Sequence, residues 1–179
     1  MRKRLLTTTL LATLAICISL CTTVLGEPRD PYQHFFNDTW GDLKEELNNA
    51  KMKGKKGILI FFELDECPYC HYMRTHVLNQ PEVQKYFREH FLNFPIDIEG
   101  AIEITDFAGN PTTQKEFATK AHRVRATPVF AIFNLKGEKI VRYTGKTSGI
   151  DEFLLLGKYA AEGHYEKMPF SVYKRKQNK

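Results

Sequence analysis

The feature that most constrains this chain is a pair of cysteines placed shortly after a continuous apolar run. Residues 57–62, Gly-Ile-Leu-Ile-Phe-Phe, are typical of a strand buried on both faces of a sheet. Cys67 and Cys70 follow, and His71 comes directly after the second cysteine. Cys-x-x-Cys-His is the attachment signature of a c-type haem, whereas Cys-x-x-Cys can also form a redox-active dithiol. The rest of the chain has to separate these two chemistries.

The N-terminus has the pattern of a secretory signal. Basic residues at positions 2–4 precede an uncharged, mostly apolar run over residues 5–25. We expect residues 1–26 to be a signal peptide that is cleaved after Gly26. If the segment is not cleaved, it would act as a membrane anchor and would still place the rest of the chain outside the cytoplasm. The predicted location is therefore the periplasm or another extracytoplasmic compartment.

Cleavage would leave only Cys67 and Cys70 of the four cysteines. A disulfide that closes so short a loop constrains little of the unfolded chain, so we expect this pair to serve reactivity or ligand binding. Two cysteines cannot form a four-cysteine zinc site, no other cluster has zinc spacing, and no metal is expected. Removing three of the 26 basic residues leaves 23 against 21 acidic ones, which argues against a nucleic-acid partner.

The hydrophobic pattern predicts alternating helices and strands. The expected helices cover 39–49, 67–77, a segment beginning at 81, 112–121 and 150–160, and the expected strands cover 57–62, 91–98, 129–133 and 139–144. This order predicts one α/β domain at residues 39–162, with a sheet covered by helices on both faces. A loose lead-in, 27–38, is expected before the domain and a C-terminal tail, 163–179, after it. The basic end of this tail, 174–179, is expected to be solvated, whereas its aromatic residues Tyr165, Phe170 and Tyr173 are expected to pack on the domain.

Three details complete this prediction. Thr39 is expected to cap the first helix, and Trp40 is expected to lie in the core. Pro95 indicates a sheet edge or a bulge in its strand, because proline lacks the N–H group that a central strand donates. Residues 99–111 are expected to form an irregular excursion.

This order of elements resembles the thioredoxin fold. In that fold a Cys-x-x-Cys opens the helix after the central strand, and a proline with a cis peptide precedes the last hairpin. Here these features correspond to Cys67-Pro68-Tyr69-Cys70 and to Ala126-Thr127-Pro128. The resemblance covers residues 40–160 and implies a central mixed β-sheet flanked by helices.

Two longer stretches, FFELDECPYCHYM and VRATPVFAIFNLKGEKIVRYTG, are similar to the exported SoxW-type thioredoxins. This similarity implies an extracytoplasmic thiol–disulfide oxidoreductase that reduces disulfides in exported proteins. It also implies a membrane electron-transfer partner that recharges the dithiol. We expect a monomer with no cofactor besides the redox-active Cys67–Cys70 disulfide.

The chain departs from ordinary thioredoxins close to the cysteines. Glu66 replaces the tryptophan that usually precedes the first cysteine, and Phe61 replaces a buried aspartate. The residues between the cysteines are Pro68 and Tyr69, as in glutaredoxins, rather than Gly-Pro. These departures affect the redox potential and the handling of protons more than the basic reaction.

The two cysteines are expected to have different roles. Thiol–disulfide exchange needs one thiolate that attacks and a second thiol that resolves the mixed disulfide. Cys67 lies at a predicted helix N-terminus, which favours a thiolate, so it is assigned as the nucleophile. Cys70 lies one turn further and is assigned as the resolving thiol. Glu63 is the candidate proton relay for Cys70, and the alternative for Glu63 is a carboxylate paired with a lysine or with solvent.

Further residues are candidates for support or substrate binding. Pro68 suits the first helical turn, and Tyr69 either contacts substrate or covers the helix start. The resemblance implies that the Thr127 backbone pairs with an extended substrate segment and that Pro128 has a cis peptide. Glu63, Asp65 and Glu66 disfavour the thiolate, while His71 and Arg74 favour it. We expect a moderately reducing dithiol.

Three alternatives remain open. A disulfide oxidase or isomerase would use the same site, so the direction of electron flow is not decided. A c-type haem protein would use Cys67, Cys70 and His71, but the two buried strands fit poorly with the mostly helical chain that a haem needs. A binding module without catalysis is disfavoured by the intact cysteine pair.

Overall fold

A computed structural model describes residues 26–177, and the predicted signal peptide lies almost wholly outside this range. The main sheet has four strands in the order β2-β1-β5-β6. Strand β1 is parallel to β2 and antiparallel to β5, and β5 and β6 form an antiparallel hairpin. The strands are β1 (Gly57–Glu63), β2 (Phe91–Asp97), β5 (Val129–Asn134) and β6 (Lys139–Thr144). The predicted mixed sheet is therefore confirmed.

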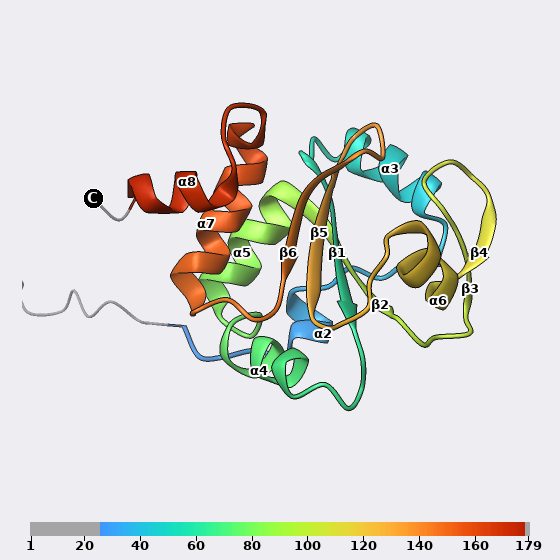
Figure 1. Cartoon of the computed structure of the whole chain (residues 1–179), viewed down its shortest axis with the longest axis horizontal. Coiled ribbons are helices and arrows are strands. Elements are labelled where there is room, and N and C mark those ends of the chain that lie inside the picture. The colour runs from blue at the N-terminus through green and yellow to red at the C-terminus, as the bar shows by residue number, and fades with distance from the viewer. Residues whose placement is uncertain (1–25, 178–179) are drawn as a thin grey trace, which may run out of the picture.

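Helices cover both faces of this sheet (Figure 1). They are α2 (Pro31–His34), α3 (Leu43–Met52), α4 (Pro68–His76), α5 (Pro81–His90), α6 (Gln114–Glu116), α7 (Ile150–Ala161) and α8 (Phe170–Gln177). Figure 1 shows α4, α5, α7 and α8 on one side of the sheet, and α3 and α6 on the other. None of the helices within residues 26–177 is both long and apolar enough to cross a membrane.

Strand β1 runs through the middle of the core, and all seven of its residues are buried. Alternate side chains of a strand point to opposite faces, so β1 contributes to two separate apolar clusters. Leu59 and Phe61 pack with residues of α4, α5 and α7, whereas Ile58, Ile60 and Phe62 pack with α3. A strand buried on both faces must be apolar throughout, which explains its uninterrupted hydrophobic sequence.

Strand β2 is an edge strand, which is one of the two arrangements that Pro95 indicated. Polar groups from two other segments of the chain hydrogen-bond to its outer edge. Asn37 donates its backbone N–H to the Asn93 carbonyl (2.8 Å) and accepts the Asn93 N–H at its side chain (2.9 Å). The Asp97 N–H donates to Oε1 of Gln114 (3.1 Å). Proline and these contacts leave few free backbone groups for another strand to pair with.

The segment 27–38 is more ordered than a loose lead-in. Asp30 accepts the Tyr32 N–H at the start of α2. Phe35 and Phe36 are buried and belong to the cluster between the sheet and α7. Phe36 stacks on Phe61 of β1, with ring centroids 5.9 Å apart. The two aromatic side chains therefore attach the segment to the core, a long-range contact that local periodicity does not reveal.

The first long helix begins later than predicted. Asp42, not Thr39, caps it by accepting the Glu45 N–H (2.9 Å). Trp40 therefore lies in the loop before α3, and its side chain is fully exposed. The expectation that Trp40 lies in the core was wrong, because helical spacing was extended one turn beyond the true cap.

The excursion at 99–111 contains most of a small second sheet, which the sequence did not indicate. Strands β3 (Glu103–Thr105) and β4 (Pro111–Thr113) form an antiparallel pair. Beyond it, the predicted helix 112–121 is the short α6 followed by a π-helical turn, Phe117–Ala121. The C-terminal segment folds back as α8, and its Tyr173 is buried, as expected for the aromatic residues there.

Candidate active site

The cysteine pair lies where β1 leads into α4. Cys67 is the N-cap of α4, and its Sγ accepts the backbone N–H of Cys70 (3.1 Å). Pro68 occupies the first turn, where no intrahelical partner for an N–H is needed. Cys67 and Cys70 form a disulfide with their Cα atoms 5.2 Å apart. The helix predicted at 67–77 is therefore confirmed with a one-residue difference at each end.

The two sulfur-bearing residues differ in access to solvent. Cys67 retains 7% of its surface, whereas Cys70 is 0% exposed. The N-terminus of α4 also offers unpaired N–H groups and a positive dipole end to the Cys67 sulfur. A substrate can reach Cys67 first, and Cys70 lies protected one helical turn inside.

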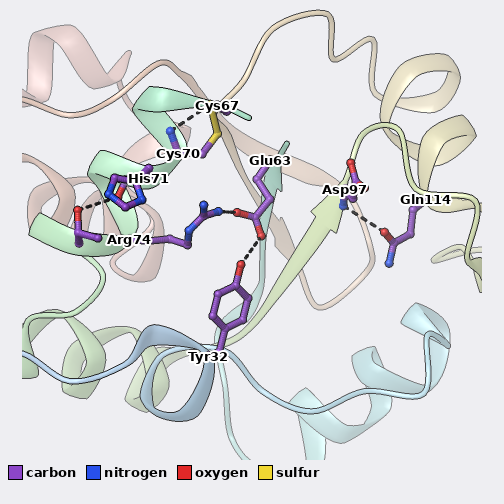
Figure 2. A network of polar contacts seen from close by, with 9 residues as sticks. Tyr32, Glu63, Cys67, Cys70, His71, Arg74, Asp97 and Gln114 are labelled. Atoms are coloured by element: carbon purple, nitrogen blue, oxygen red, sulfur yellow. Dashed lines mark hydrogen bonds and ion pairs between the residues drawn. A yellow bond between two sulfur atoms is a disulfide. The ribbon is translucent and has the colours of Figure 1, made fainter. Parts of the chain in front are cut away.

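Glu63, the last residue of β1, is buried and has two side-chain partners (Figure 2). The Arg74 guanidinium forms an ion pair with Oε2 of Glu63, and the Tyr32 hydroxyl donates to Oε1 (3.2 Å). Arg74 follows Cys70 by four residues, so both side chains lie on one face of α4. The carboxylate does pair with a cation, but this cation is an arginine rather than the lysine considered from the sequence.

Burial raises the pKa of Glu63 above its ordinary value, and Arg74 and the Tyr32 hydroxyl partly oppose this shift. Burial and the nearby carboxylate of Glu63 raise the pKa of Tyr32. At neutral pH, protonating the Glu63 carboxylate therefore costs less free energy than protonating an exposed glutamate.

The residues expected to contact substrate lie near the same end of the sheet. The Thr127–Pro128 peptide bond is cis, as the resemblance implied. The pairing of Phe62 with Val129 places Pro128 beside the end of β1, where the loop to Cys67 begins. Thr127 is half-buried, Pro128 is buried, and Tyr69 is 56% exposed on the first turn of α4.

His71 is exposed on α4, and its carbonyl accepts the Thr75 hydroxyl (2.8 Å). Figure 2 shows His71 on the turn of α4 that also carries Cys70. Asp65 and Glu66 are exposed in the loop before Cys67, so their charges face solvent near the helix N-terminus. Within residues 26–177, no three His, Cys, Asp or Glu side chains are placed to hold a metal ion.

Sequence reasoning missed Tyr32 as part of this site. Tyr32 lies 31 residues before Glu63, and no motif connects the two positions. Asp97 was also missed as a neighbour, although the β1–β2 register places it directly beside Glu63. The parallel pairing of the predicted strands could have indicated Asp97, whereas Tyr32 required the fold of the N-terminal segment.

Comparison with known proteins assigns the family. A family model described as a thioredoxin-like domain matches residues 43–161. The chain belongs to this thioredoxin-like family. The comparison with curated proteins found no match. The family, the fold and a Cys-x-x-Cys pair at disulfide distance make the chain a thiol–disulfide oxidoreductase.

Solved structures confirm the thioredoxin fold. A thioredoxin-fold protein from Helicobacter pylori is 21% identical, with a TM-score of 0.57 over 70% of this chain and 86% of that protein. A DsbH oxidoreductase is 18% identical, with a TM-score of 0.55 over 79% of this chain and 94% of that one. A putative disulphide-isomerase from Bacteroides thetaiotaomicron is 23% identical, with a TM-score of 0.54 over 71% and 92% of the two chains.

Proposed function

We propose that this thioredoxin-like protein works outside the cytoplasm as a SoxW-type reductant of disulfides in exported proteins. The observation that carries the assignment of roles is the unequal exposure of the two cysteines at the start of α4. Cys67 is the nucleophile, and Cys70 is the resolving thiol. The predicted signal peptide supports the extracytoplasmic location, although it falls outside the described residues except for Gly26.

The reaction starts from the reduced dithiol. The Cys67 thiolate attacks one sulfur of the substrate disulfide, forms a mixed disulfide and expels the other substrate sulfur as a thiolate. Cys70 then loses its proton and attacks the Cys67 sulfur. This step forms the Cys67–Cys70 bond and releases the second substrate thiolate. Two electrons pass to the substrate, and each released thiolate takes up a proton from solvent at neutral pH.

Glu63 is proposed as the acceptor of the Cys70 proton. Glu63 is buried, and in the view of Figure 2 it lies between the cysteine pair and Tyr32. Burial holds its pKa above the ordinary value, which brings its basicity closer to that of a thiol. A buried thiol needs such a nearby acceptor because water has little access to Cys70.

The remaining site residues are proposed to bind substrate or adjust the thiols. Tyr69 offers an exposed aromatic ring beside the nucleophile. The Thr127 backbone pairs with an extended substrate segment, and Pro128 shapes that surface. Pro68 fixes the first turn of α4, and His71 lies on the same helix beside Cys70 in the sequence.

The proposed partners follow from this function. The substrates are disulfide-bearing exported proteins, and a membrane electron-transfer protein would return electrons to the oxidised pair. The monomeric state and the absence of nucleic-acid binding are further parts of the proposal. No cofactor is required, because the Cys67–Cys70 pair itself carries the two electrons.

The deciding experiment measures the Cys67/Cys70 redox potential against glutathione, together with the reduction of insulin. A reductase should lie toward the thioredoxin value of about −270 mV, whereas about −120 mV is typical of a strong oxidant. Asp65 and Glu66 near the nucleophile favour the reducing end, because their charges disfavour the thiolate. A potential near the oxidant value would refute the reductase proposal and favour the oxidase or isomerase alternative.

The roles of the cysteines have a separate test. Cys67→Ser should abolish turnover, because no other thiol at the site is accessible for attack. Cys70→Ser should accumulate mixed disulfides with substrate, because the resolving thiol is missing. Equal residual turnover in the two variants would contradict this assignment.

A further inference from the structure

The carboxylate of Glu63 is buried, but both of its hydrogen-bonding partners reach solvent. A cavity of about 320 Å³ lies between the N-terminal segment and α4, and Tyr32 and Arg74 both line it. Tyr32 is 52% exposed, whereas Glu63 is only 7% exposed. The two partners therefore connect an interior carboxylate to the cavity.

This cavity is separate from the surface where a substrate would bind. It is lined by residues 28–32 of the N-terminal segment and by Arg74, Thr75 and Asn79. Neither Cys67 nor the proposed substrate-contact residues Tyr69 and Thr127 line this cavity. In the view of Figure 2, the Glu63 carboxyl group lies between the cysteine pair and Tyr32. A substrate that covers Cys67 would therefore leave the Tyr32 side of Glu63 open.

We propose that Tyr32 is a positioning residue that orients the Glu63 carboxylate for the resolving step and passes the Cys70 proton to water in the cavity. This inference rests on the proposed role of Cys70 as the resolving thiol. The proton of the Cys70 thiol moves to Glu63, and the Cys70 thiolate attacks the Cys67 sulfur. Once Glu63 is protonated, the Tyr32 hydroxyl turns so that it donates to water and accepts from Glu63. The Glu63 proton then moves to the Tyr32 oxygen as the hydroxyl proton moves to water, and the hydroxyl turns back. Glu63 and Tyr32 both return to their starting states.

Arg74 has the complementary part in this mechanism. Its ion pair fixes Oε2 of Glu63, while Tyr32 donates to Oε1, so the two oxygens have distinct partners. The other charged groups around Glu63 are Asp65 in the following loop and Asp97 beside it in the sheet. On the β5 side the neighbours Pro128 and Val129 are uncharged. Arg74 is thus the cation that favours the charged form of Glu63, opposing the effect of burial on its pKa.

The test uses the full chain with Cys17→Ser and Cys21→Ser, so that Cys67 and Cys70 are its only thiols. Reduced protein is mixed with excess 5,5′-dithiobis(2-nitrobenzoate), and the release of the coloured thiolate is followed. The first release reports the attack by Cys67 and accelerates with reagent concentration. The second release reports the attack by Cys70 within the adduct and does not depend on that concentration. The rate of the second release is measured across pH.

Tyr32→Phe removes one hydroxyl and retains the ring that lies 5.5 Å from Phe36. Without this donor, the charged form of Glu63 loses a hydrogen bond, so its pKa should rise. The acid limb is the part of the pH profile in which the rate of the second release falls as the pH is lowered. We expect this limb to shift to higher pH by about 0.5–1 pH unit. Below the limb, the rate should fall by about three- to tenfold for the same reason. The first release should stay unchanged.

Two comparisons make the result specific. Glu63→Gln should remove this acid limb, and adding Tyr32→Phe to it should change nothing further. Tyr86→Phe, at a half-buried tyrosine of α5 outside the network, is the matched control and should behave as the parent chain. Thermal unfolding of each variant separates a loss of packing from a shift of the pH profile.

The inference is overturned if Tyr32→Phe leaves the acid limb in place. It is also overturned if Tyr32→Phe slows the second release equally in the Glu63→Gln background. The proposed function fails in a different way, through the absence of two successive releases or through a potential typical of an oxidant. A fast exchange with an unmoved limb would reject the role of Tyr32 and leave the oxidoreductase assignment intact.

Discussion

Acidification should destabilise the domain through His122, which follows the π-helical turn. Its ring packs against Phe62, Phe117 and Phe133, with the nearest ring centroid, that of Phe117, 4.5 Å away. Burial, together with the nearby charges of Lys139 and Arg142, lowers the pKa of His122 from 6.5 to about 4. The folded state therefore favours the neutral imidazole, and the unfolded chain binds the proton more readily.

The sign of the effect follows from this depressed pKa. The stabilising contribution of neutral His122 is complete above pH 6.5 and is lost as the pH falls toward about 4. Over the interval from pH 7 to pH 5, the two pKa values correspond to about 1.8 kcal/mol of unfolding free energy. Because the ring is partly exposed, we expect about 1–1.5 kcal/mol.

The assay is urea denaturation at pH 7 and pH 5, followed by circular dichroism, on the parent chain and on His122→Phe. Phenylalanine keeps an aromatic ring among the three phenylalanines but cannot take up a proton. The variant should lose less stability between the two pH values by the amount given above. His76→Phe, at an exposed position of α4, serves as the control. If His122→Phe loses as much stability as the parent chain, the reasoning about the buried imidazole is refuted.

Three further predictions concern the two ends of the domain and its exposed tryptophan. Phe35→Ala should lower the unfolding free energy by about 3–5 kcal/mol in urea melts, because a fully buried ring is lost. A change below about 1 kcal/mol would contradict the position of Phe35 in the core. Lys174→Ala should lower the unfolding free energy at pH 7 and much less near pH 2, because the ion pair between Lys174 and Glu152 helps to lower the pKa of Glu152 to about 2. An equal loss at both pH values in urea melts would contradict the ion pair as the cause. Trp40→Ala should change the unfolding free energy by less than about 0.5 kcal/mol, since its side chain contributes no buried area, and a larger loss would show that Trp40 packs in solution.

The sheet could be predicted from the sequence because its strands carry a strong local signal. The run at 57–62 is apolar at every position, and Pro95 marked the edge strand. The cysteine motif, together with the proline at 128, then fixed where the sheet and the first helix of the site meet. Each of these features can be predicted from a few consecutive residues, because it depends on their hydrophobicity or on the backbone chemistry of proline and cysteine.

The parts that could not be predicted depend on contacts between distant residues. Phe35 and Phe36 follow two prolines and have no periodic pattern, yet they fill the core above Phe61. Tyr32 reaches the site because these two rings, together with hydrogen bonds of Arg29 to Asn79 and Gln84, attach its helix to the domain. Trp40 shows the reverse case, a residue predicted to be buried that is exposed. Its spacing matched the buried face of a helix, but α3 begins only at Leu43.

The placement of Phe35 and Phe36 has a practical consequence for work with shortened proteins. A fragment that begins at residue 43 would keep the entire family match and both cysteines. It would nevertheless lose two aromatic rings from the interior and the hydroxyl that contacts Glu63. Poor folding or weak exchange by such a fragment would report the missing N-terminal residues, and the chemistry of the cysteine pair should be measured on protein that retains them.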